Sequence, residues 1–157
     1  MEKPKKILAT NHDMGSAQAM VPALRELSRL GYEVVTLADA EAPALQVFRA
    51  SELEVRTADS QVDLLTIPAK ENPDLVLVGV SVPEYGSEKW ALKAAAMLGI
   101  PTAFIVETWP HRWLDIYGER DIPLYSQSHL AFLWDEVSCE YMKSKGFDFT
   151  KLVATGN

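Results

Sequence analysis

The sequence predicts a single α/β domain in which helices cover both faces of a mostly parallel β-sheet. Short apolar runs alternate with stretches whose apolar residues recur every three or four positions, as on one face of a helix. Glycines follow the last turn of several of these stretches, where helices commonly end. The strongest run, Leu75 to Val80, is apolar without alternation, which is typical of a strand covered on both faces. Strands and helices that alternate in this way form right-handed crossovers and a doubly wound parallel sheet.

The first half of the chain contains two strand–helix units and a less regular stretch. The helix of the first unit places Met20, Leu24 and Leu27 on one face and ends before Gly31. Pro43 fits the first turn of the second helix, where its missing N–H costs little. In chain order we expect a strand at 6–9, a helix at 17–30, a strand at 34–38, a helix at about 41–50, a strand at 53–57 and an ambiguous segment at 62–70.

The second half begins with Leu75 to Val80, which we expect at the centre of the sheet between the strands 6–9 and 102–106. The segment 107–128 contains tryptophans, tyrosines and prolines without clean periodicity, so no regular element is predicted there. The remaining expected elements are a helix ending at Leu98 before Gly99, a strand at 130–134, a helix at 135–145 before Gly146 and a strand at 152–154.

Composition excludes several classes of protein. The 157 residues fit one domain, 1–157, and 48% of them are apolar, which is enough for a core. The 15 basic and 22 acidic residues give a net charge of −7, which opposes nucleic-acid binding. No apolar run approaches the length of a membrane span. Cys139 is the single cysteine and cannot form an internal disulfide, so we expect a cytoplasmic protein.

The loops at the carboxyl ends of parallel strands carry the binding site in this fold class. The first such loop has neither a Gly-x-Gly-x-x-Gly pattern nor a phosphate-binding loop, so no nucleotide cofactor is predicted. Gly15 permits the turn at the start of the helix, and Asp13 or Ser16 is expected to cap it. We expect ligand contacts from Asn11, Gly15 and Ser16, and from Ser81 in the loop after the central strand.

His12, Asp13 and Glu107 are the candidate catalytic residues. His12 ends the first strand and could transfer a proton, although adjacent residues on extended chain tend to point apart, which argues against a dyad with Asp13. Glu107 directly follows an apolar strand, where core packing explains a carboxylate poorly. Trp109, His111, Arg112 and Trp113 form either a wall for a sugar or phosphate or an interface anchor.

Other polar residues have structural explanations. Glu84 and Glu88 suit the positive end of the helix that they begin. Asp135 is expected to cap its helix, and Cys139 to be an inert buried thiol. No metal-ligand spacing is present, so no metal site is predicted.

The order of these segments resembles the opening of GT-B-type glycosyltransferases and of the related UDP-N-acetylglucosamine 2-epimerases. The likeness covers nearly the whole chain, and its individual motifs are of low specificity. It is carried by the first strand and Gly-containing loop at 7–15, the helix 17–30, Gly31-Tyr32-Glu33-Val34-Val35, Phe48 in the helix 44–50, Asn72-Pro73-Asp74-Leu75-Val76-Leu77-Val78-Gly79, the stretch 91–103, Asp135-Glu136 to Gly146-Phe147, and Lys151 to Asn157.

The resemblance implies a Rossmann-like fold and the acceptor-side half of an enzyme with two such domains. In that family the second domain holds a nucleotide-sugar donor, and the active site lies between the domains. The chain would then bind a small sugar or sugar-phosphate acceptor. It would be either a free-standing subunit that needs a donor-binding subunit or a second copy of itself, or a truncated or repurposed acceptor half. Two alternatives stay open: a noncatalytic ligand-binding or assembly module, and a self-sufficient small enzyme.

Overall fold

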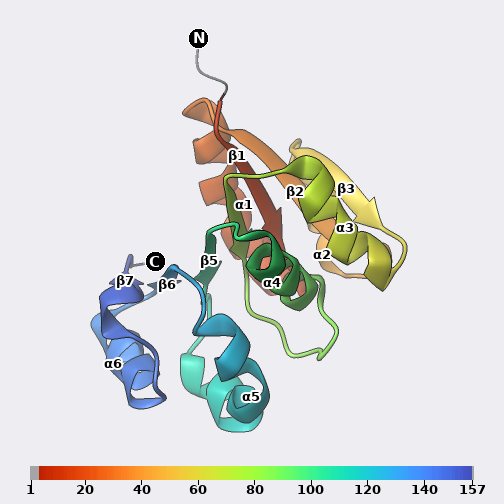
Figure 1. Ribbon diagram of the computed structural model, residues 1–157. Coiled ribbons are helices and arrows are strands. Elements are labelled where there is room, and N and C mark those ends of the chain that lie inside the picture. The colour runs from red at the N-terminus through yellow and green to blue at the C-terminus, as the bar shows by residue number, and fades with distance from the viewer. Residues whose placement is uncertain (1–3, 157) are drawn as a thin grey trace.

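The computed structural model describes residues 4–156, in which seven strands form one parallel sheet of order β3-β2-β1-β4-β5-β6-β7 (Figure 1). In the register, Leu8 of β1 lies between Val35 and Val76. The predicted fold class is therefore confirmed, and so is the position of β4 between β1 and β5. The strands are β1 (Lys6–Thr10), β2 (Glu33–Asp39), β3 (Glu54–Ala58), β4 (Leu75–Val78), β5 (Thr102–Ile105), β6 (Leu130–Leu133) and β7 (Leu152–Ala154).

Six α-helices and one short 3₁₀ helix connect the strands. The ambiguous segment is a helix, because Ser60 caps it by accepting a hydrogen bond from the backbone N–H of Asp63. Gly99 ends another helix with a φ of 68°, a conformation that favours glycine. The helices are α1 (Met14–Arg29), α2 (Ala44–Ala50), α3 (Gln61–Glu71), α4 (Ser87–Leu98), α5 (Pro110–Tyr125), α6 (Glu136–Ser144) and η1 (Phe149–Lys151).

Helix α5 lies in the segment for which the sequence predicted no regular element. Its buried positions do recur at helical spacing, but two of them, Gly118 and Asp121, are not apolar and hide the pattern. The full set is Pro110, Trp113, Leu114, Gly118, Asp121 and Tyr125.

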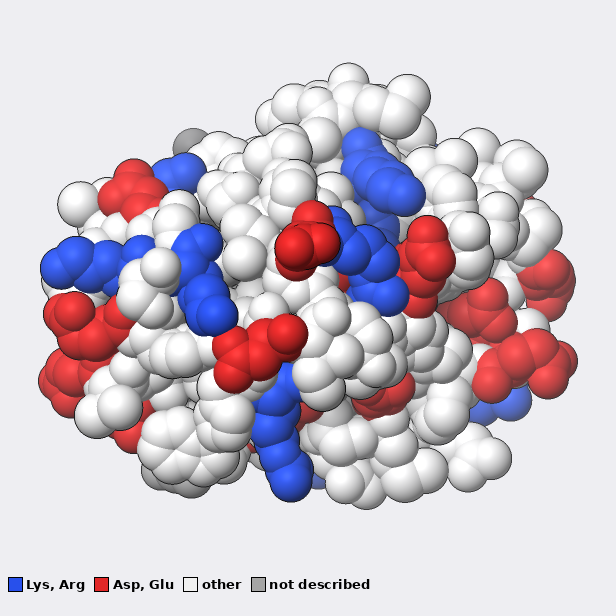
Figure 2. Space-filling view, turned by 90° about the horizontal axis from the view of Figure 1, so that it is seen from below, with Lys and Arg blue, Asp and Glu red and all other residues white. Residues whose placement is uncertain are grey.

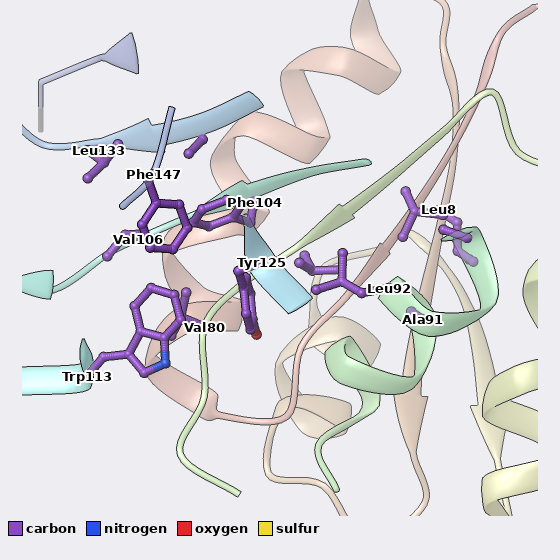
Figure 3. Packing of buried hydrophobic residues seen from close by; sticks show 14 of the residues in the cluster. Leu8, Val80, Ala91, Leu92, Phe104, Val106, Trp113, Tyr125, Leu133 and Phe147 are labelled. Carbon is purple, nitrogen blue, oxygen red and sulfur yellow. The ribbon is translucent and has the colours of Figure 1, made fainter. Parts of the chain in front are cut away.

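Two apolar clusters fill the space between the sheet and its two layers of helices. On one face, α1 and α2 pack through residues such as Met20 and Phe48. On the other face, α3 to α6 pack against β1 to β6. Figure 3 shows the aromatic centre of this second cluster, where the ring centroids of Trp113 and Tyr125 are 4.9 Å apart and those of Phe104 and Tyr125 are 5.2 Å apart. Aromatic edges packed in this way fix α5 against β5.

The face that carries α1 and α2 is covered unevenly. Ile105 and Phe132 on this face are only partly buried, and Leu130 is 41% exposed. Within residues 4–156, the helices on this side cover the half of the sheet that contains β1 to β3 and leave β5 to β7 more open. In the same part of the chain, no helix is both long enough and apolar enough to cross a membrane.

Candidate functional site

The carboxyl ends of β1, β4 and β5 meet at one edge of the sheet, because the three strands are parallel neighbours. The segments that follow them begin at Asn11, Gly79 and Val106. Figure 2 looks onto this edge, where acidic and basic side chains are interspersed with uncharged surface. The field at the edge is therefore set by individual groups rather than by a broad patch of one sign.

Asn11 organises the loop between β1 and α1. It is fully buried, and its amide Nδ2 donates to the backbone carbonyl of Asp13 at 3.0 Å. The expected capping of α1 is wrong: Asp13 occupies the N-cap position but makes no side-chain cap hydrogen bond, and the buried hydroxyl of Ser16 has no partner. The loop is thus shaped by Asn11, and polar groups at the start of α1 are left unpaired.

Gly79 lets the polar side chains of this loop approach the end of β4. A Cβ at this position would overlap the Ser16 hydroxyl and lie 2.8 Å from Cγ of Asn11. The oxygen Oδ1 of Asn11 and the hydroxyl of Ser16 both lack a hydrogen-bond partner. Two unpaired polar atoms therefore lie against the backbone of β4, in a position where burial without a partner costs free energy.

Glu107 lies directly beyond the end of β5, close to the start of α1. Burial raises the pKa of its carboxyl, and the negative charges of Asp13 and Glu88 raise it further. The Ser16 hydroxyl is near enough to lower this pKa in part, but the two groups do not form a hydrogen bond of good geometry, and Oε2 of Glu107 is buried without a partner. A carboxyl with a raised pKa and a free oxygen is suited to proton transfer or to binding a hydroxyl.

Glu88 belongs to the same region and lies in the first turn of α4, as the sequence predicted. It is fully buried, its Oε1 accepts a hydrogen bond from the Ser81 hydroxyl, and its Oε2 has no partner. Burial raises the pKa of Glu88, against the opposing effects of Ser81, Lys89 and His12. Helix α4 therefore begins with a buried carboxyl rather than with a solvated one.

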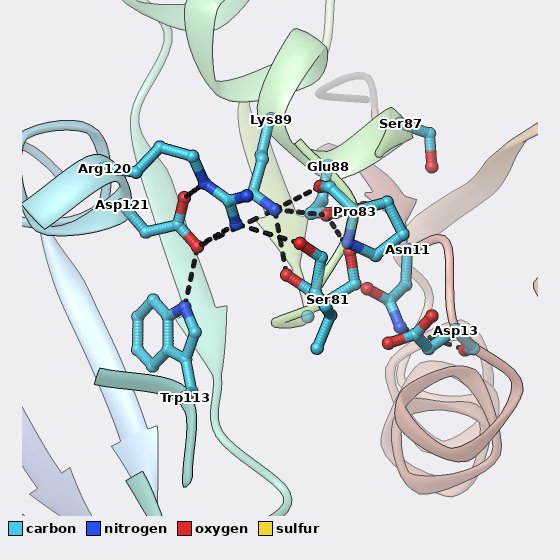
Figure 4. Close-up of polar contacts among 12 residues, drawn as sticks. Asn11, Asp13, Ser81, Pro83, Ser87, Glu88, Lys89, Trp113, Arg120 and Asp121 are labelled. Atoms are coloured by element: carbon cyan, nitrogen blue, oxygen red, sulfur yellow. Dashed lines mark hydrogen bonds and ion pairs between the residues drawn. The ribbon is translucent and has the colours of Figure 1, made fainter. Parts of the chain in front are cut away.

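Two cationic side chains hold the loop between β4 and α4 in place (Figure 4). The Lys89 ammonium donates to the carbonyls of Ser81 at 2.8 Å and Pro83 at 2.5 Å. Arg120 donates from Nη2 to the carbonyl of Val82 at 2.9 Å, which ties the loop to α5. Three consecutive carbonyls of the loop are thereby satisfied by cations from two helices.

Asp121 is the counter-ion of this arrangement. Its carboxylate accepts from Trp113 Nε1 at 2.8 Å and from Arg120 Nε at 2.6 Å, and it lies 3.7 Å from Nζ of Lys89. Burial by itself would raise the pKa of Asp121, but the hydrogen bonds from Arg120 and Trp113 outweigh it and lower the pKa. Burial lowers the pKa of Lys89, while Glu88 and Asp121 oppose that effect.

The structure brings together the predicted residues of the first loop and Glu107. Asp13 and Ser16 are near enough to the Glu107 carboxyl to raise and to lower its pKa, respectively. His12 is near enough to neighbouring Glu88 to lower the pKa of that carboxyl. Gly15 lies at the start of α1 with open space where a Cβ would be.

The other predicted residues lie apart from that group or are engaged elsewhere. Ser81 is buried, and its hydroxyl donates a hydrogen bond to Glu88. Trp109 and His111 line a separate groove of about 360 Å³ between α5 and α6, together with Tyr141. Arg112 is exposed on the first turn of α5. The expectation for Trp113 is wrong, because its ring is buried in the core and its Nε1 donates to Asp121.

A larger groove of about 530 Å³ reaches Glu107 from the face of the sheet that carries α1. Trp134 lines this groove, and its ring lies edge-on to that of Trp109, with centroids 6.0 Å apart. The two grooves are therefore separated by one pair of tryptophans at the carboxyl edge.

Sequence reasoning missed the network of Lys89, Arg120 and Asp121. The only local signal was the spacing of Trp113 and Asp121, which places both on one face of a helix. Within residues 4–156, no group of three or more His, Cys, Asp or Glu side chains is arranged to hold a metal ion. Cys139 is buried and unpaired, and Asp135 caps α6 by accepting from the N–H of Ser138 at 2.8 Å, both as predicted.

A scan of protein-family models and a search of curated proteins gave no match. Solved structures do share the fold. The complex of S. aureus MnaA with UDP has a TM-score of 0.75 at 18% identity, over 98% of this chain and 44% of that one. UDP-GlcNAc 2-epimerase from Neisseria meningitidis, bound to UDP-GlcNAc, has a TM-score of 0.71 at 21% identity, over 97% of this chain and 47% of that one.

MurG from Acinetobacter baumannii gives a TM-score of 0.63 at 11% identity, over 83% of this chain and 41% of that one. The chain thus spans about half the length of the solved structures that it matches. At these identities the shared property is the fold. The chain therefore has the fold of one Rossmann-like half of a GT-B enzyme, as the sequence resemblance predicted.

Proposed function

We propose that this domain is the acceptor-side half of a GT-B-like glycosyltransferase. The observation that carries the proposal is the group of buried polar atoms without partners where β1, β4 and β5 end, namely Oδ1 of Asn11, the hydroxyl of Ser16, Oε2 of Glu88 and Oε2 of Glu107. Buried polar groups in native proteins are nearly always paired, so such a group indicates a place where a ligand completes the hydrogen bonding. The hydroxyls of a sugar or sugar phosphate can both donate and accept in such a place.

Glu107 has the role of proton acceptor in the proposed reaction. As the acceptor hydroxyl forms its bond to the anomeric carbon of the donor, it loses a proton, and the nucleoside diphosphate departs with the electrons of the old glycosidic bond. A raised pKa makes the ionised carboxylate of Glu107 a stronger base for that proton. His12 and Asp13, on the neighbouring loop, are the groups proposed to orient the acceptor.

The donor would be held by a second domain, whether in a longer chain, on another subunit or on a second copy of this chain. Two features support this: the chain spans about half the length of its structural neighbours, and its first loop lacks a pattern that binds phosphates through the backbone. The net charge of −7 gives no support to a nucleic-acid partner. The unpaired thiol of Cys139 is compatible with a reducing cytoplasm.

The proposal is tested by titrating the pure chain with UDP-, GDP- and CDP-sugars in a calorimeter and by measuring its sedimentation. A monomer or dimer with no tight binding of any nucleotide-sugar is the expected result, because the donor site is on the other half. Micromolar or tighter binding of one nucleotide-sugar by a strict monomer would contradict the proposal and favour a self-sufficient small enzyme.

A transfer assay separates the catalytic proposal from a noncatalytic ligand-binding module. The chain is combined with a separately expressed donor-binding domain, and glycosyl transfer to sugar acceptors is followed by mass spectrometry. Transfer that depends on both components and is lost in Glu107→Gln supports the proposal. Acceptor binding without transfer, in a complex that binds donor, would identify a noncatalytic module instead.

A further inference from the structure

The groove that reaches Glu107 has an apolar floor and one wall of small side chains. Its floor is formed by Leu77, Ile105 and Phe132, from three neighbouring strands, and its wall by Ala19 and Ala23 of α1. The two alanines are exposed and lie four residues apart, so they face the same side of the helix. Their small side chains leave a space of about 530 Å³, within the range of small-molecule sites.

This groove lies on the part of the sheet that the helices of the domain leave open. Strands of a parallel sheet usually have helices over both faces, yet Ile105 and Phe132 are only partly buried. Apolar surface left in water is unfavourable in free energy. An apolar ligand body placed along α1 would remove this surface from water without any change in the fold.

One end of the groove carries the polar group that would orient such a ligand. Glu107 lines the groove where it reaches the carboxyl edge, and its Oε2 is buried without a hydrogen-bond partner. Trp134 lines the same end. A molecule with an apolar body and a hydroxyl-bearing head would cover the apolar floor and pair with Glu107 at once.

We propose that the acceptor is an amphiphile, a hydroxyl-bearing head joined to an aliphatic or aromatic body, with the head at Glu107 and the body in the groove between α1 and β4 to β6. This inference rests on the proposed function and names the class of its acceptor. Glu107 favours a small molecule over an apolar helix of a partner, since a helix that presented only apolar side chains would leave Oε2 unpaired, whereas a hydroxyl pairs with it.

The test uses octyl β-D-glucopyranoside, kept below its micelle concentration, and glucose as the matched head group without a body. Binding to the full chain is measured by calorimetry and by the fluorescence of Trp134, compared with a Trp134→Phe variant. Each buried methylene is worth about 0.8 kcal/mol, or about fourfold in affinity, so burial of a few methylenes gives octyl glucoside at least about tenfold tighter binding than glucose.

A variant that fills the groove provides the structural control. Ala23→Phe places a ring in the groove from an exposed helix position and is expected to weaken octyl glucoside binding at least about tenfold, while binding of glucose is unchanged. Ala50→Phe makes the same change at an exposed position at the end of α2, outside the groove, and is expected to leave both affinities unchanged.

Three results would overturn the inference: equal affinity for the two probes, octyl glucoside binding that Ala23→Phe leaves intact, and a dimer that Ala23→Phe dissociates, which would identify a second copy as the occupant. None of these results touches the proposed function, which is judged by the nucleotide-sugar titration and the transfer assay. Glycosyl transfer to polar acceptors alone would support the proposed function and contradict the proposal that the acceptor is an amphiphile.

Discussion

Replacement of Asp121 by alanine is expected to destabilise the domain by about 3–5 kcal/mol, the typical cost of removing one partner of a buried ion pair. The carboxylate is 1% exposed and is shared by Trp113, Arg120 and Lys89. Without it, the buried Lys89 ammonium keeps only Glu88 as an acidic neighbour. The raised pKa of Glu88 leaves that neighbour less ionised.

The loss can be divided by its physical causes. The indole N–H of Trp113 would be buried without an acceptor, which costs about 1–3 kcal/mol. The remainder comes from the uncompensated charge of Lys89. Asp121→Asn keeps one acceptor oxygen and loses the charge, so its effect is expected to lie between those of wild type and Asp121→Ala.

Urea unfolding followed by far-UV circular dichroism measures the effect. Asp115→Ala is the matched control, because Asp115 lies on the same helix and pairs with Lys145 at 2.8 Å, but its side chain is 52% exposed. The free energy of unfolding should fall much less in that control, because exposed ion pairs contribute little to stability. Equal losses for the two alanine variants would refute the argument that burial makes Asp121 essential.

The effect of Asp121 also has a predicted dependence on pH. The hydrogen bonds from Arg120 and Trp113 lower its pKa in the folded protein, despite burial. Its contribution to stability is therefore fully present above the pKa of the unfolded chain and is lost as the pH falls through the folded pKa. The stability difference between wild type and Asp121→Ala should shrink in acid, and a constant difference would contradict this assignment.

Three further predictions test other parts of the structure by substitution. Burial raises the pKa of Glu88 in the folded protein above its value in the unfolded chain. The wild type should therefore lose stability relative to Glu88→Gln as the pH rises from the pKa of the unfolded chain through that of the folded protein. Parallel profiles of stability against pH for the two proteins would contradict a buried, titrating carboxyl. Gly79→Ala should cost about 1–3 kcal/mol through overlap with its neighbours, while Gly15→Ala, with open space around it, should not lower the thermal midpoint. Asp135→Ala should lower the free energy of unfolding by about 0.5–2 kcal/mol, because it removes the cap of α6. Asp13→Ala removes no cap hydrogen bond and should lower it less. Equal losses for the two variants in urea unfolding would contradict this prediction.

Most of the fold could be predicted because its strands are short, apolar and separated by helices with one apolar face. Leu75 to Val78 lies at the centre of the pattern and, as predicted, between β1 and β5. Helix α5 could not be predicted because its buried face includes Gly118 and Asp121, which do not register as apolar. Asp121 is buried with Trp113 and Arg120 of its own helix and with Lys89 of α4 as partners. The contact with α4 leaves no local mark in the sequence.

The candidate site was predictable only in part for a related reason. Glu107 could be singled out because a carboxylate directly after an apolar strand lies at the carboxyl edge of a parallel sheet. Glu88 and Lys89 could not, since two charged residues at the start of a helix suggest solvent exposure. They are buried because Asp121 and the carbonyls of the loop after β4 supply their partners, which are known only once the chain is folded.

The central claim is that the acceptor binds where β1, β4 and β5 end, in contact with Glu107. It is tested most directly by adding monosaccharides and sugar phosphates to the isotope-labelled chain and mapping the changes in amide chemical shift. We predict that the largest changes fall in 11–16, 79–81 and 106–109 and that Glu107→Gln weakens the binding. Changes confined to the amino-terminal edge of the sheet, or none for any sugar in the panel, would contradict the claim.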